Sequence, residues 1–503
     1  MSRLVVVSNR LPTPRSWGAA GHAEEPEIPA GGLASALLAA LRQRPKSVWF
    51  GWNGRVTALE RSRRVTSNKI ADVDLLGLGL TQGEVSDYYL GFCNEALWPL
   101  FHCFPDKARV RVDQEARYRA VQARFAAALL PHLRPDDLVW VHDYHLLLVA
   151  AELRRNGWRG RIGFFLHTPF PPYELWQILP DPQGFLRAML DYDVVGFQVR
   201  GFLDNYVYCC ARRLGAAWDG ARLRACGRSQ HAGTYPVGIE PVWFRPPGDT
   251  PRRRRHRGEL ARVVSGRRLI LGVDRLDYTK GIPERILALE EFLQRHPEWR
   301  RKVSFMQIAA PSRASLPQYA QQKSLVESLV GRVNGELAEH DWEPVRYLYR
   351  SYSRDVLARF YREADVGLVT PLRDGMNLVA KEFVAAQDLA SPGVLVLSRC
   401  AGAAEDLPEA ITVNPFVAAD VAGGIERALV MPLEERRERQ SALLRRVLRA
   451  TAADWSRRFV EDLAGGEQAR AAPDAKRGVE QLEARAPRPH AATAADRAQS
   501  LKQ

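Results

Sequence analysis

Short apolar runs of strand-like composition alternate along this chain with longer segments of helical periodicity, and this alternation restricts the possible folds strongly. Segments such as 114–133 and 283–295 carry apolar residues at i, i+3 and i+4 spacing. Such an order is typical of βαβ units, in which helices cover a parallel sheet. The sequence therefore predicts an α/β fold, with strands at residues 4–8, 138–141, 162–166, 194–198, 269–273, 303–308, 366–370 and 394–398.

The predicted strands fall into two groups, and 503 residues are enough for two or more domains. One group precedes residue 235 and the other follows residue 267. The stretch between them is rich in Pro, Gly and Arg, which is typical of a connection. We predict two Rossmann-like domains that face each other across a deep cleft, at residues 1–240 and 241–466, with a last helix that crosses back to the first domain. Residues 467–503 contain almost no large apolar side chains, so we predict a disordered tail.

Positive charge dominates the composition, because 72 Lys and Arg residues outnumber 58 Asp and Glu residues and give a net charge of +14. The densest basic run is at residues 252–257. It has few aromatic neighbours and no ladder on which bases could stack. We therefore favour a solvated loop over a nucleic-acid patch, and predict no nucleic-acid partner. A positive cleft would also raise the association rate of phosphorylated substrates.

The cysteines and the apolar runs bear on the cellular compartment. Six cysteines without CxxC spacing are too few for a disulfide scaffold and wrongly spaced for structural zinc. The apolar runs are shorter than the roughly 20 residues that cross a bilayer. The initial run MSRLVVVSNR is broken by Asn and Arg, unlike a signal peptide. We predict a reducing, cytoplasmic location and no membrane partner.

Common nucleotide-binding and hydrolase motifs are absent from the sequence. GxxxxGK[ST], GxGxxG after a strand, HExxH and GxSxG do not occur, which argues against P-loop NTPases, standard NAD-binding domains and the corresponding hydrolases. The pairs Asp72/Asp74 and Asp191/Asp193 fit a DxD metal pattern, but only weakly. We therefore predict no metal site. The run from His142 to His145 is assigned to substrate contact, because adjacent residues on one turn rarely converge on one ion.

Polar clusters follow six of the predicted strands. In open α/β sheets ligands bind at the carboxyl ends of strands, which is where these clusters lie. Each cluster alone is better explained by a salt-bridged core or surface group than by a ligand site. Six at equivalent positions indicate a ligand site, at residues 8–10, 142–143, 167, 275 with 280, 312–313 and 373–377.

The residue types in these clusters suit phosphate and sugar. Gly31 and Gly32 precede a predicted helix at 33–41, and residues 374–377 precede another at 378–386. Free N–H groups at a helix N-terminus favour phosphate, although tight turns explain the glycines as well. Charge-assisted bonds to phosphate oxygens could come from Arg10, Arg275, Lys280 and Arg313. Sugar hydroxyls could donate to Asp143, Asp374 and Glu382, of which the last two lie about two helical turns apart.

Nine sequence blocks resemble one enzyme family. In chain order they are RLVVVSNRLP, AGGLA, WFGWNG, YYLGFCNEALWPLFH, VWVHDYHL, IGFFLHTPFPP, DRLDYTKGIPER, QIAAPSR and VGLVTPLRDGMNLVAKEFVAAQ. They are similar to the trehalose-6-phosphate synthases of glycosyltransferase family 20, which are retaining enzymes with the GT-B fold. The match covers about residues 3–460, and the HDYHL and DGMNLVAKE blocks are highly specific.

The resemblance implies a reaction and an organisation. Glucose would pass from UDP-glucose to glucose 6-phosphate with retention, giving α,α-trehalose 6-phosphate and UDP. The domain 1–240 would bind the acceptor, and 241–466 the nucleotide sugar. The displacement would be front-side, with the leaving phosphate oxygen taking the acceptor's proton. No cofactor would be required, with Mg²⁺ at most stimulatory. Relatives are dimers or tetramers, which implies a homo-oligomer.

The resemblance also implies roles for matching residues. Arg10 and Arg313 would grip the acceptor's phosphate, and Trp52, Tyr89, Trp98 and Asp143 would bind its sugar. The catalytic set would be Asp143, His167, Arg275, Lys280 and Asp374. Tyr352, often Phe in the family, would lie near uracil, and the loop at 11–28 is longer than the family pattern. The donor site would comprise Gly31, Gly32, His167, Arg275, Lys280, Tyr352, Asp374, Gly375, Met376, Asn377, Leu378, Val379, Ala380, Lys381 and Glu382.

Other functions on the same scaffold stay open at this point. A glucosylglycerol-phosphate synthase would use ADP-glucose and glycerol 3-phosphate, and a related transferase would join cyclitols. Tyr89, Trp98 and Trp52 favour a full sugar ring over glycerol. A non-catalytic sugar-phosphate sensor is a further alternative. The sequence does not give the nucleotide preference, the oligomeric state or the physiological role, for which osmoprotection is the expectation.

Overall fold

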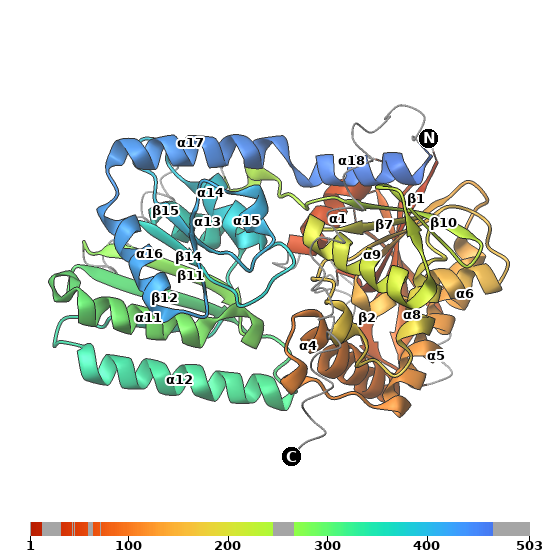
Figure 1. The fold of residues 1–503 in the computed structure, drawn as a ribbon, viewed down its shortest axis with the longest axis horizontal. Helices are drawn as coiled ribbons and strands as arrows, with labels where there is room; N and C mark the ends of the chain where they lie inside the picture. Colours follow the sequence, from red (N-terminus) through yellow and green to blue (C-terminus); the bar gives the residue numbers. More distant parts are fainter. Residues whose placement is uncertain are drawn as a thin grey trace, which may run out of the picture.

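Two separate β-sheets organise the computed structural model, which describes residues 2–12, 32–42, 44, 46–58, 64–70, 72–244 and 266–465. The predicted tail at 467–503, the basic run at 252–257, Gly31 and most of the loop at 11–28 lie outside these residues. Figure 1 shows the two halves side by side, joined along one side by two long helices.

The N-terminal sheet has ten strands within the described residues, in the order β3-β4-β2-β1-β5-β6-β7-β10-β9-β8. Its central strands pair in parallel: β1 (Leu4–Arg10), β2 (Val48–Val56), β4 (Val73–Leu80), β5 (Leu138–His142), β6 (Ile162–Phe165), β7 (Val194–Phe197) and β10 (Arg228–Thr234). Antiparallel strands finish the two edges: β3 (Val65–Ile70), β8 (Ala217–Trp218) and β9 (Arg222–Ala225).

Helices cover both faces of this sheet. α5 (Val112–Leu129) contacts α6 (Val149–Arg155), and α6 contacts α8 (Pro182–Met189). The helix predicted at 114–133 runs from Val112 to Leu129. It ends before the predicted residue because Pro131 belongs to a 3₁₀ turn at Leu130–His132. The other helices are α1 (Gly32–Arg42), α3 (Gln82–Glu84), the π-helix η1 (Val85–Leu97), α4 (Trp98–Phe101), α6 (Val149–Arg155), α7 (Tyr173–Trp176), α8 (Pro182–Met189) and α9 (Arg200–Leu214).

The C-terminal sheet has six described strands, all parallel, in the order β13-β12-β11-β14-β15-β16. They are β11 (Arg268–Arg275), β12 (Val303–Ala310), β13 (Val345–Leu348), β14 (Val366–Val369), β15 (Val394–Ser398) and β16 (Ile411–Val413). Helices α11 and α12 lie on one side of the sheet and α13 and α14 on the other (Figure 1). Its helices are α11 (Ile282–Arg295), α12 (Pro317–Leu337), α13 (Arg354–Glu363), α14 (Leu378–Ala386), α15 (Ala403–Asp406) and α16 (Ala418–Val430).

The chain crosses between the halves twice, and the two crossings touch. After α17 (Leu433–Arg449) the chain returns as α18 (Ala452–Leu463), which contacts α1 and β7 of the N-terminal half. At the crossing, Ala452 N donates to Ile239 O at 3.1 Å. A Cβ on Gly238 would lie 1.9 Å from Ala450 O, so glycine permits this approach. A capping box of Thr451 and Asp454 begins α18.

Helix α18 is part of the N-terminal core. The rings of Trp455 and Phe459 lie 4.8 and 4.6 Å from Trp140 on β5. A Cβ on Gly163 of β6 would lie 2.6 Å from Phe459, which explains how closely the helix approaches the sheet. All three aromatic side chains are at most 1% exposed.

The structure confirms the predicted class of two parallel α/β units facing each other. The strand predicted at 4–8 continues to Arg10, and the helix predicted at 378–386 has those bounds. Strands β2, β3, β4, β8, β9, β10, β13 and β16 were not predicted. No helix among the described residues is long and apolar enough to span a membrane.

Candidate active site

A cavity of about 660 Å³ lies where the carboxyl ends of the two sheets face each other. Both halves line it, as expected when polar loops follow the strands of two facing sheets. The predicted residues among its lining are Arg10, Tyr89, Trp98, Asp143, His167, Arg275, Lys280, Arg313, Tyr352, Asp374, Met376, Asn377, Leu378, Val379 and Glu382.

The C-terminal wall holds paired charges. Lys280 Nζ lies 2.5 Å from Asp374 Oδ2, and Asn377 Nδ2 donates to the same oxygen at 3.0 Å. Lys280 is placed by a short turn after β11, which Asp277 caps through the N–H of Thr279. Burial is the largest single influence on the pKa of Asp374 and raises it, but Lys280 together with His102 and Arg275 lowers that pKa below its usual value.

Arg313 reaches from the C-terminal half to the N-terminal half. Its Nη1 donates to Asp277 Oδ2 at 3.1 Å and to Tyr319 Oη at 2.5 Å. Its Nη2 donates to Tyr144 Oη at 3.2 Å, and its Cζ lies 4.0 Å from the centre of the Trp98 ring. The guanidinium is therefore fixed from both sides of the cleft.

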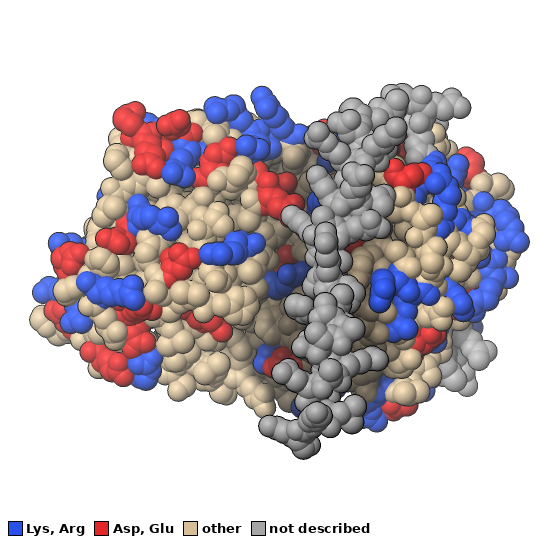
Figure 2. Space-filling model, in the orientation of Figure 1, with Lys and Arg blue, Asp and Glu red and all other residues tan. Residues whose placement is uncertain are grey.

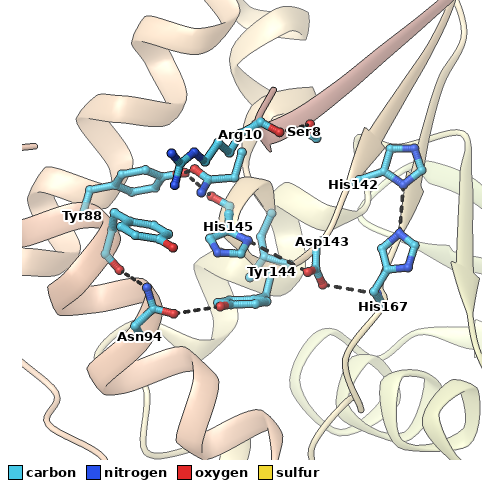
Figure 3. Close-up of polar contacts among 12 residues, drawn as sticks. Ser8, Arg10, Tyr88, Asn94, His142, Asp143, Tyr144, His145 and His167 are labelled. Carbon is cyan, nitrogen blue, oxygen red and sulfur yellow. Dashed lines mark hydrogen bonds and ion pairs between the residues drawn. The ribbon is translucent and has the colours of Figure 1, made fainter. Parts of the chain in front are cut away.

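The N-terminal wall consists mostly of aromatic and uncharged polar side chains, several of which Figure 3 labels. Asp143, directly after β5, has a left-handed backbone with φ of 72° and accepts a hydrogen bond from His167 N at 3.2 Å. Burial raises the pKa of Asp143 to about 6, against the lowering effect of three backbone N–H groups. Tyr88 Oη lies 2.7 Å from Asn9 Oδ1, and Tyr144 Oη donates to Asn94 Oδ1 at 3.0 Å.

Four histidines belong to this wall, namely His102, His142, His145 and His167, and all are uncharged at neutral pH. His142 Nδ1 lies 3.1 Å from His167 Nε2. The ring of His145 stacks at 6.0 Å on Tyr89. Burial lowers the pKa of His167 to about 3 and holds the pKa values of His142 and His145 well below the ordinary one. His142 is fully buried, so its predicted direct contact with substrate is replaced by a contact with His167.

Arg10 and Trp52 form the open end of the same wall. Arg10 is exposed at the end of β1, and its Cζ lies 5.4 Å from the centre of the Trp52 ring. Trp52 does not line the cavity: it is 4% exposed, packs 5.6 Å from Tyr89 and donates to Arg55 O at 2.9 Å. Its position is behind Arg10 and Tyr89, which corrects the predicted direct contact with a sugar.

Several predicted donor residues lie away from the cavity surface. Lys381 is 2% exposed, and its Nζ donates to Val237 O at 2.8 Å and to Asp406 Oδ2 at 2.6 Å, so its side chain ties α14 to the first crossing. Ala380 is fully buried. Gly375 meets the other half, since a Cβ there would lie 1.9 Å from His167 O. Gly32 is the first residue of α1, and Gly31 lies outside the described residues.

The far end of the cavity contains side chains that no strand-end pattern indicated. Arg354 Cζ lies 4.2 Å from the centre of the Trp243 ring. Arg350 Nε donates to Tyr352 Oη at 2.7 Å. Glu382 accepts from Tyr361 Oη at 3.0 Å, and burial raises the pKa of Glu382. Trp243 precedes the connection between the domains, so only the folded arrangement brings it to Arg354.

No group of three or more side chains among the described residues could hold a metal ion. In the DxD pair that precedes β7, Asp193 Oδ2 accepts from Arg154 at 2.8 Å and from Ile162 N at 2.7 Å, and Asp191 pairs with Arg228. These carboxylates lie at the amino end of the strand, opposite to the cavity edge.

The surface charge is uneven. On the face in Figure 2, Lys and Arg side chains gather along the outer edge of the N-terminal half, whereas both signs are mixed over the C-terminal half. The basic residues visible on that edge lie away from the cleft, so the cations that matter to the cavity are the few that line it.

Comparisons with known proteins agree over nearly the whole chain. The family model described as glycosyltransferase family 20 matches residues 2–465. A trehalose-6-phosphate synthase of Sinorhizobium fredii is 43% identical over 464 residues, which are 92% of this chain and 98% of that protein. Two solved structures are also similar.

One is a UDP-forming α,α-trehalose-phosphate synthase from Burkholderia xenovorans in complex with glucose 6-phosphate. It has a TM-score of 0.85 and 38% identity, and the match covers 92% of this chain and 100% of that one. The other, from E. coli, is bound with UDP-2-fluoro glucose. It has a TM-score of 0.84 and 38% identity, with coverage of 92% and 99%.

Proposed function

This chain belongs to glycosyltransferase family 20 and has the GT-B fold, and on that premise we propose that it transfers glucose from UDP-glucose to glucose 6-phosphate, giving trehalose 6-phosphate and UDP. One observation carries the proposal. A single cavity brings a mostly neutral wall of aromatic and polar side chains against a wall that carries the cations Arg275, Lys280 and Arg313. A reaction between two phosphorylated sugars needs both.

The acceptor end is proposed to lie between Arg10 and Arg313, which would bind the 6-phosphate by charge-assisted hydrogen bonds. Arg313 is already oriented by Asp277 and Tyr319, so little ordering is required of it. The carboxylate of Asp143 would accept hydrogen bonds from the acceptor's hydroxyls. Tyr89 and Trp98 offer apolar surface to a sugar ring, although Arg313 covers part of Trp98.

The donor end is proposed to lie against the C-terminal half. Arg275 and Lys280 would stabilise the charge that develops on the departing diphosphate, and binding the diphosphate would draw Lys280 from its pair with Asp374. Asp374 and His167 would then be available to the hydroxyls of the glucose. The first turn of α14, with the N–H groups of Leu378 and Val379, would face the ribose and phosphate, and Tyr352 would face the base.

We propose that the transfer retains the configuration of the donor by a front-side displacement. A double displacement needs a free carboxylate nucleophile. Asp374 is a poor one, because Asn377 keeps donating to it after Lys280 has turned to the diphosphate, and its remaining acceptor capacity is proposed to go to the hydroxyls of the glucose. Asp143 accepts a backbone N–H of His167. The protein's contribution would be to position two sugars and to stabilise charge, while the leaving phosphate oxygen takes the acceptor's proton.

We propose further that no metal is required, because the two cations can neutralise the diphosphate. Activity in EDTA, with and without added Mg²⁺, tests this point.

The proposed acceptor-binding and donor-binding regions are residues 1–240 and 241–466. Arg313 belongs to the donor-binding region but is proposed to bind the acceptor's phosphate. Sparse cysteines support a cytoplasmic location, and a dimer or tetramer is the proposed assembly. Cell fractionation and light scattering test these two.

The test of the reaction is nucleotide release by the purified chain. UDP-, ADP- and GDP-glucose are each combined with glucose 6-phosphate or glycerol 3-phosphate, and products are identified by mass and NMR. Release from UDP-glucose with glucose 6-phosphate only, yielding a 1,1-linked α,α disaccharide phosphate, is the expected result. Release with glycerol 3-phosphate would identify a glucosylglycerol-phosphate synthase instead. Binding of glucose 6-phosphate without release from any donor would identify a sensor.

A further inference from the structure

The contact between His142 and His167 is a second layer of the active site. His142 is the last residue of β5, and His167 lies just after the adjacent parallel strand β6. His142 Nδ1 lies 3.1 Å from His167 Nε2 (Figure 3). Only His167 is partly exposed to the cavity, because His142 is fully buried behind it. A residue in this position can act on a ligand only through His167.

The backbone of His167 is held from two directions, which leaves its ring as the adjustable part. His167 N donates to Asp143 Oδ1 at 3.2 Å. On the other side, Gly375 of the C-terminal half packs so closely on His167 O that a Cβ there would lie 1.9 Å from it. The ring itself has His142 as its hydrogen-bond partner, and packs at 4.6 Å on Phe165 and 5.8 Å on Trp455.

A hydrogen bond between two neutral imidazoles requires one ring to donate and the other to accept. The two rings share two N–H hydrogens among four nitrogens. One hydrogen lies in the contact, and the other is on either His142 Nε2 or His167 Nδ1. His142 Nε2 is buried without a hydrogen-bond partner among the described residues. Buried N–H groups without an acceptor are rare in proteins, so this position disfavours the second hydrogen.

We propose that His142 is a positioning residue, which donates from Nδ1 to His167 Nε2 and thereby fixes His167 as the Nδ1–H tautomer. His167 then presents an N–H donor to an oxygen of the ligand in the cavity. This inference rests on the proposed function in one respect, namely that the ligand beside His167 is the glucose of UDP-glucose. The tautomer itself is a property of the free protein.

Nitrogen-15 NMR of histidine-labelled protein at pH 7.5 reads the tautomer directly, because the protonated and bare ring nitrogens differ in shift. The His167 signals are assigned by their loss in His167→Gln. The expected result is a hydrogen on Nδ1 of His167. A hydrogen on Nε2 of His167 in the unsubstituted chain would overturn the proposal.

Two variants separate the hydrogen bond from packing. His142→Asn places an amide N–H near the former Nδ1, and we expect His167 to stay protonated on Nδ1. His142→Phe fills the same space without a donor, and we expect the hydrogen of His167 to move to Nε2. Phe165→Leu is the matched control, because it alters the packing of His167 and leaves the contact between the histidines. It should leave the tautomer unchanged.

Enzyme kinetics of the same variants test whether the tautomer of His167 matters for activity. His142→Phe should lower kcat/KM for UDP-glucose by about 10- to 100-fold, the scale of a misplaced active-site group, with the KM for glucose 6-phosphate within about twofold. His142→Asn should recover most of that loss. Equal losses in His142→Asn, His142→Phe and Phe165→Leu would overturn the proposal in favour of packing alone. If UDP-glucose is not consumed at all, the proposed function fails, whereas the tautomer measurement still decides the inference.

Discussion

The N-terminal wall of the cavity holds its ligand-facing groups mostly without charge, whereas the C-terminal wall holds them as ion pairs. On the first wall, burial keeps the histidines neutral, including His142 behind His167, and raises the pKa of Asp143 to about 6. On the second, Lys280 pairs with Asp374 and Arg313 with Asp277. The difference matches two tasks. Sugar hydroxyls need donors and acceptors in fixed directions, while a leaving diphosphate needs charge that is in place before the reaction.

Arg313 and Arg10 make the sharpest contrast, because the same phosphate is proposed to bind both. Arg313→Ala should lower the free energy of unfolding by about 3–5 kcal/mol, since it leaves the fully buried Asp277 unpaired. Arg10 is exposed, so Arg10→Ala should change stability by less than about 1 kcal/mol. Each loss should raise the KM for glucose 6-phosphate by roughly 10- to 100-fold, the worth of a charged hydrogen bond.

Urea denaturation and initial rates on the two variants check this contrast. Equal losses of stability in both variants would show that the pair with Asp277 does not stabilise the fold through Arg313. The proposed difference between the paired Arg313 and the exposed Arg10 would then be wrong.

Asp143 tests whether the neutral wall is adapted to its substrate at the expense of stability. The pKa of Asp143 is about 6 in the folded chain, against its ordinary value near 3.8 in the unfolded chain. The folded chain therefore binds this proton more tightly, and the free energy of unfolding falls as the pH rises from 3.8 to 6. The loss is about 3 kcal/mol. Asp143→Asn does not titrate at this position, so its stability relative to the unsubstituted chain should improve by most of that amount, about 2.4 kcal/mol, between pH 4 and pH 7.5.

Urea denaturation at the two pH values measures this difference, and Asp136→Asn, at an exposed position, controls for loss of a charge. The Asn variant should also lose most of its activity at pH 7.5. A stability difference that does not change with pH would contradict the assignment of the raised pKa to Asp143.

Substitution of Arg275 tests the catalytic role of the C-terminal wall. Because Arg275 has no ion pair among the residues that the structure describes, a loss of activity would not be mixed with a loss of stability. No hydrogen bond or ion pair holds Arg275 within the described chain, and its Cζ lies 5.7 Å from the centre of the Trp98 ring. Arg275→Ala should lower kcat at least ~100-fold, the scale of one preorganised electrostatic contact, with stability nearly unchanged. Lys280→Ala should lose as much activity and also stability, because the buried Asp374 is left unpaired.

Lys323→Ala on α12 is the control, as it removes a surface cation whose partner is Glu327. It should not change the rate. A drop of less than fivefold in Arg275→Ala would remove Arg275 from the charged wall's catalytic role.

Gly375 lies where the two walls touch and gives the smallest effect. In Gly375→Ala the added Cβ would meet His167 O at 1.9 Å, so the walls must separate slightly, and we expect kcat to fall about tenfold. Gly335→Ala on α12 is matched, because its Cβ would meet nothing within 4 Å. It should keep full activity and gain up to about 1 kcal/mol in stability from helix propensity. Full activity in Gly375→Ala would show that the contact is not needed.

The sequence predicted the part of the site that lies at strand ends, and the reason is geometric. Periodicity located β1, β5, β6, β11, β12 and β14, and parallel strands bring their carboxyl ends to one edge. Asp143, Arg275, Lys280 and Arg313 therefore line one cavity, as their positions implied. Helix α14 was predicted with its observed bounds because its apolar pattern starts immediately after the polar DGMN turn.

Other features depend on how the halves dock and could not be read from local pattern. Lys381 follows the same turn as the cavity-lining Leu378, yet its side chain is hydrogen-bonded to the interdomain crossing. Trp52 was placed against the sugar, but β2 was not predicted and the tryptophan packs behind Tyr89. The stacking of Arg354 on Trp243 joins residues on both sides of the interdomain connection. Such contacts require the three-dimensional arrangement.

The adjacency of the two crossings determines how the cleft can open. Two flexible tethers far apart would let the halves slide, twist and swing. Here Ala452 is hydrogen-bonded to Ile239 and Gly238 lies against Ala450, so the two tethers are joined at one place. If the halves move apart by turning about this place, displacement grows with distance from it. The link from Lys381 to Val237, two residues before Ile239, would hardly move. The stack of Arg313 on Trp98 joins the halves across the cleft, so any opening of the cleft must break it.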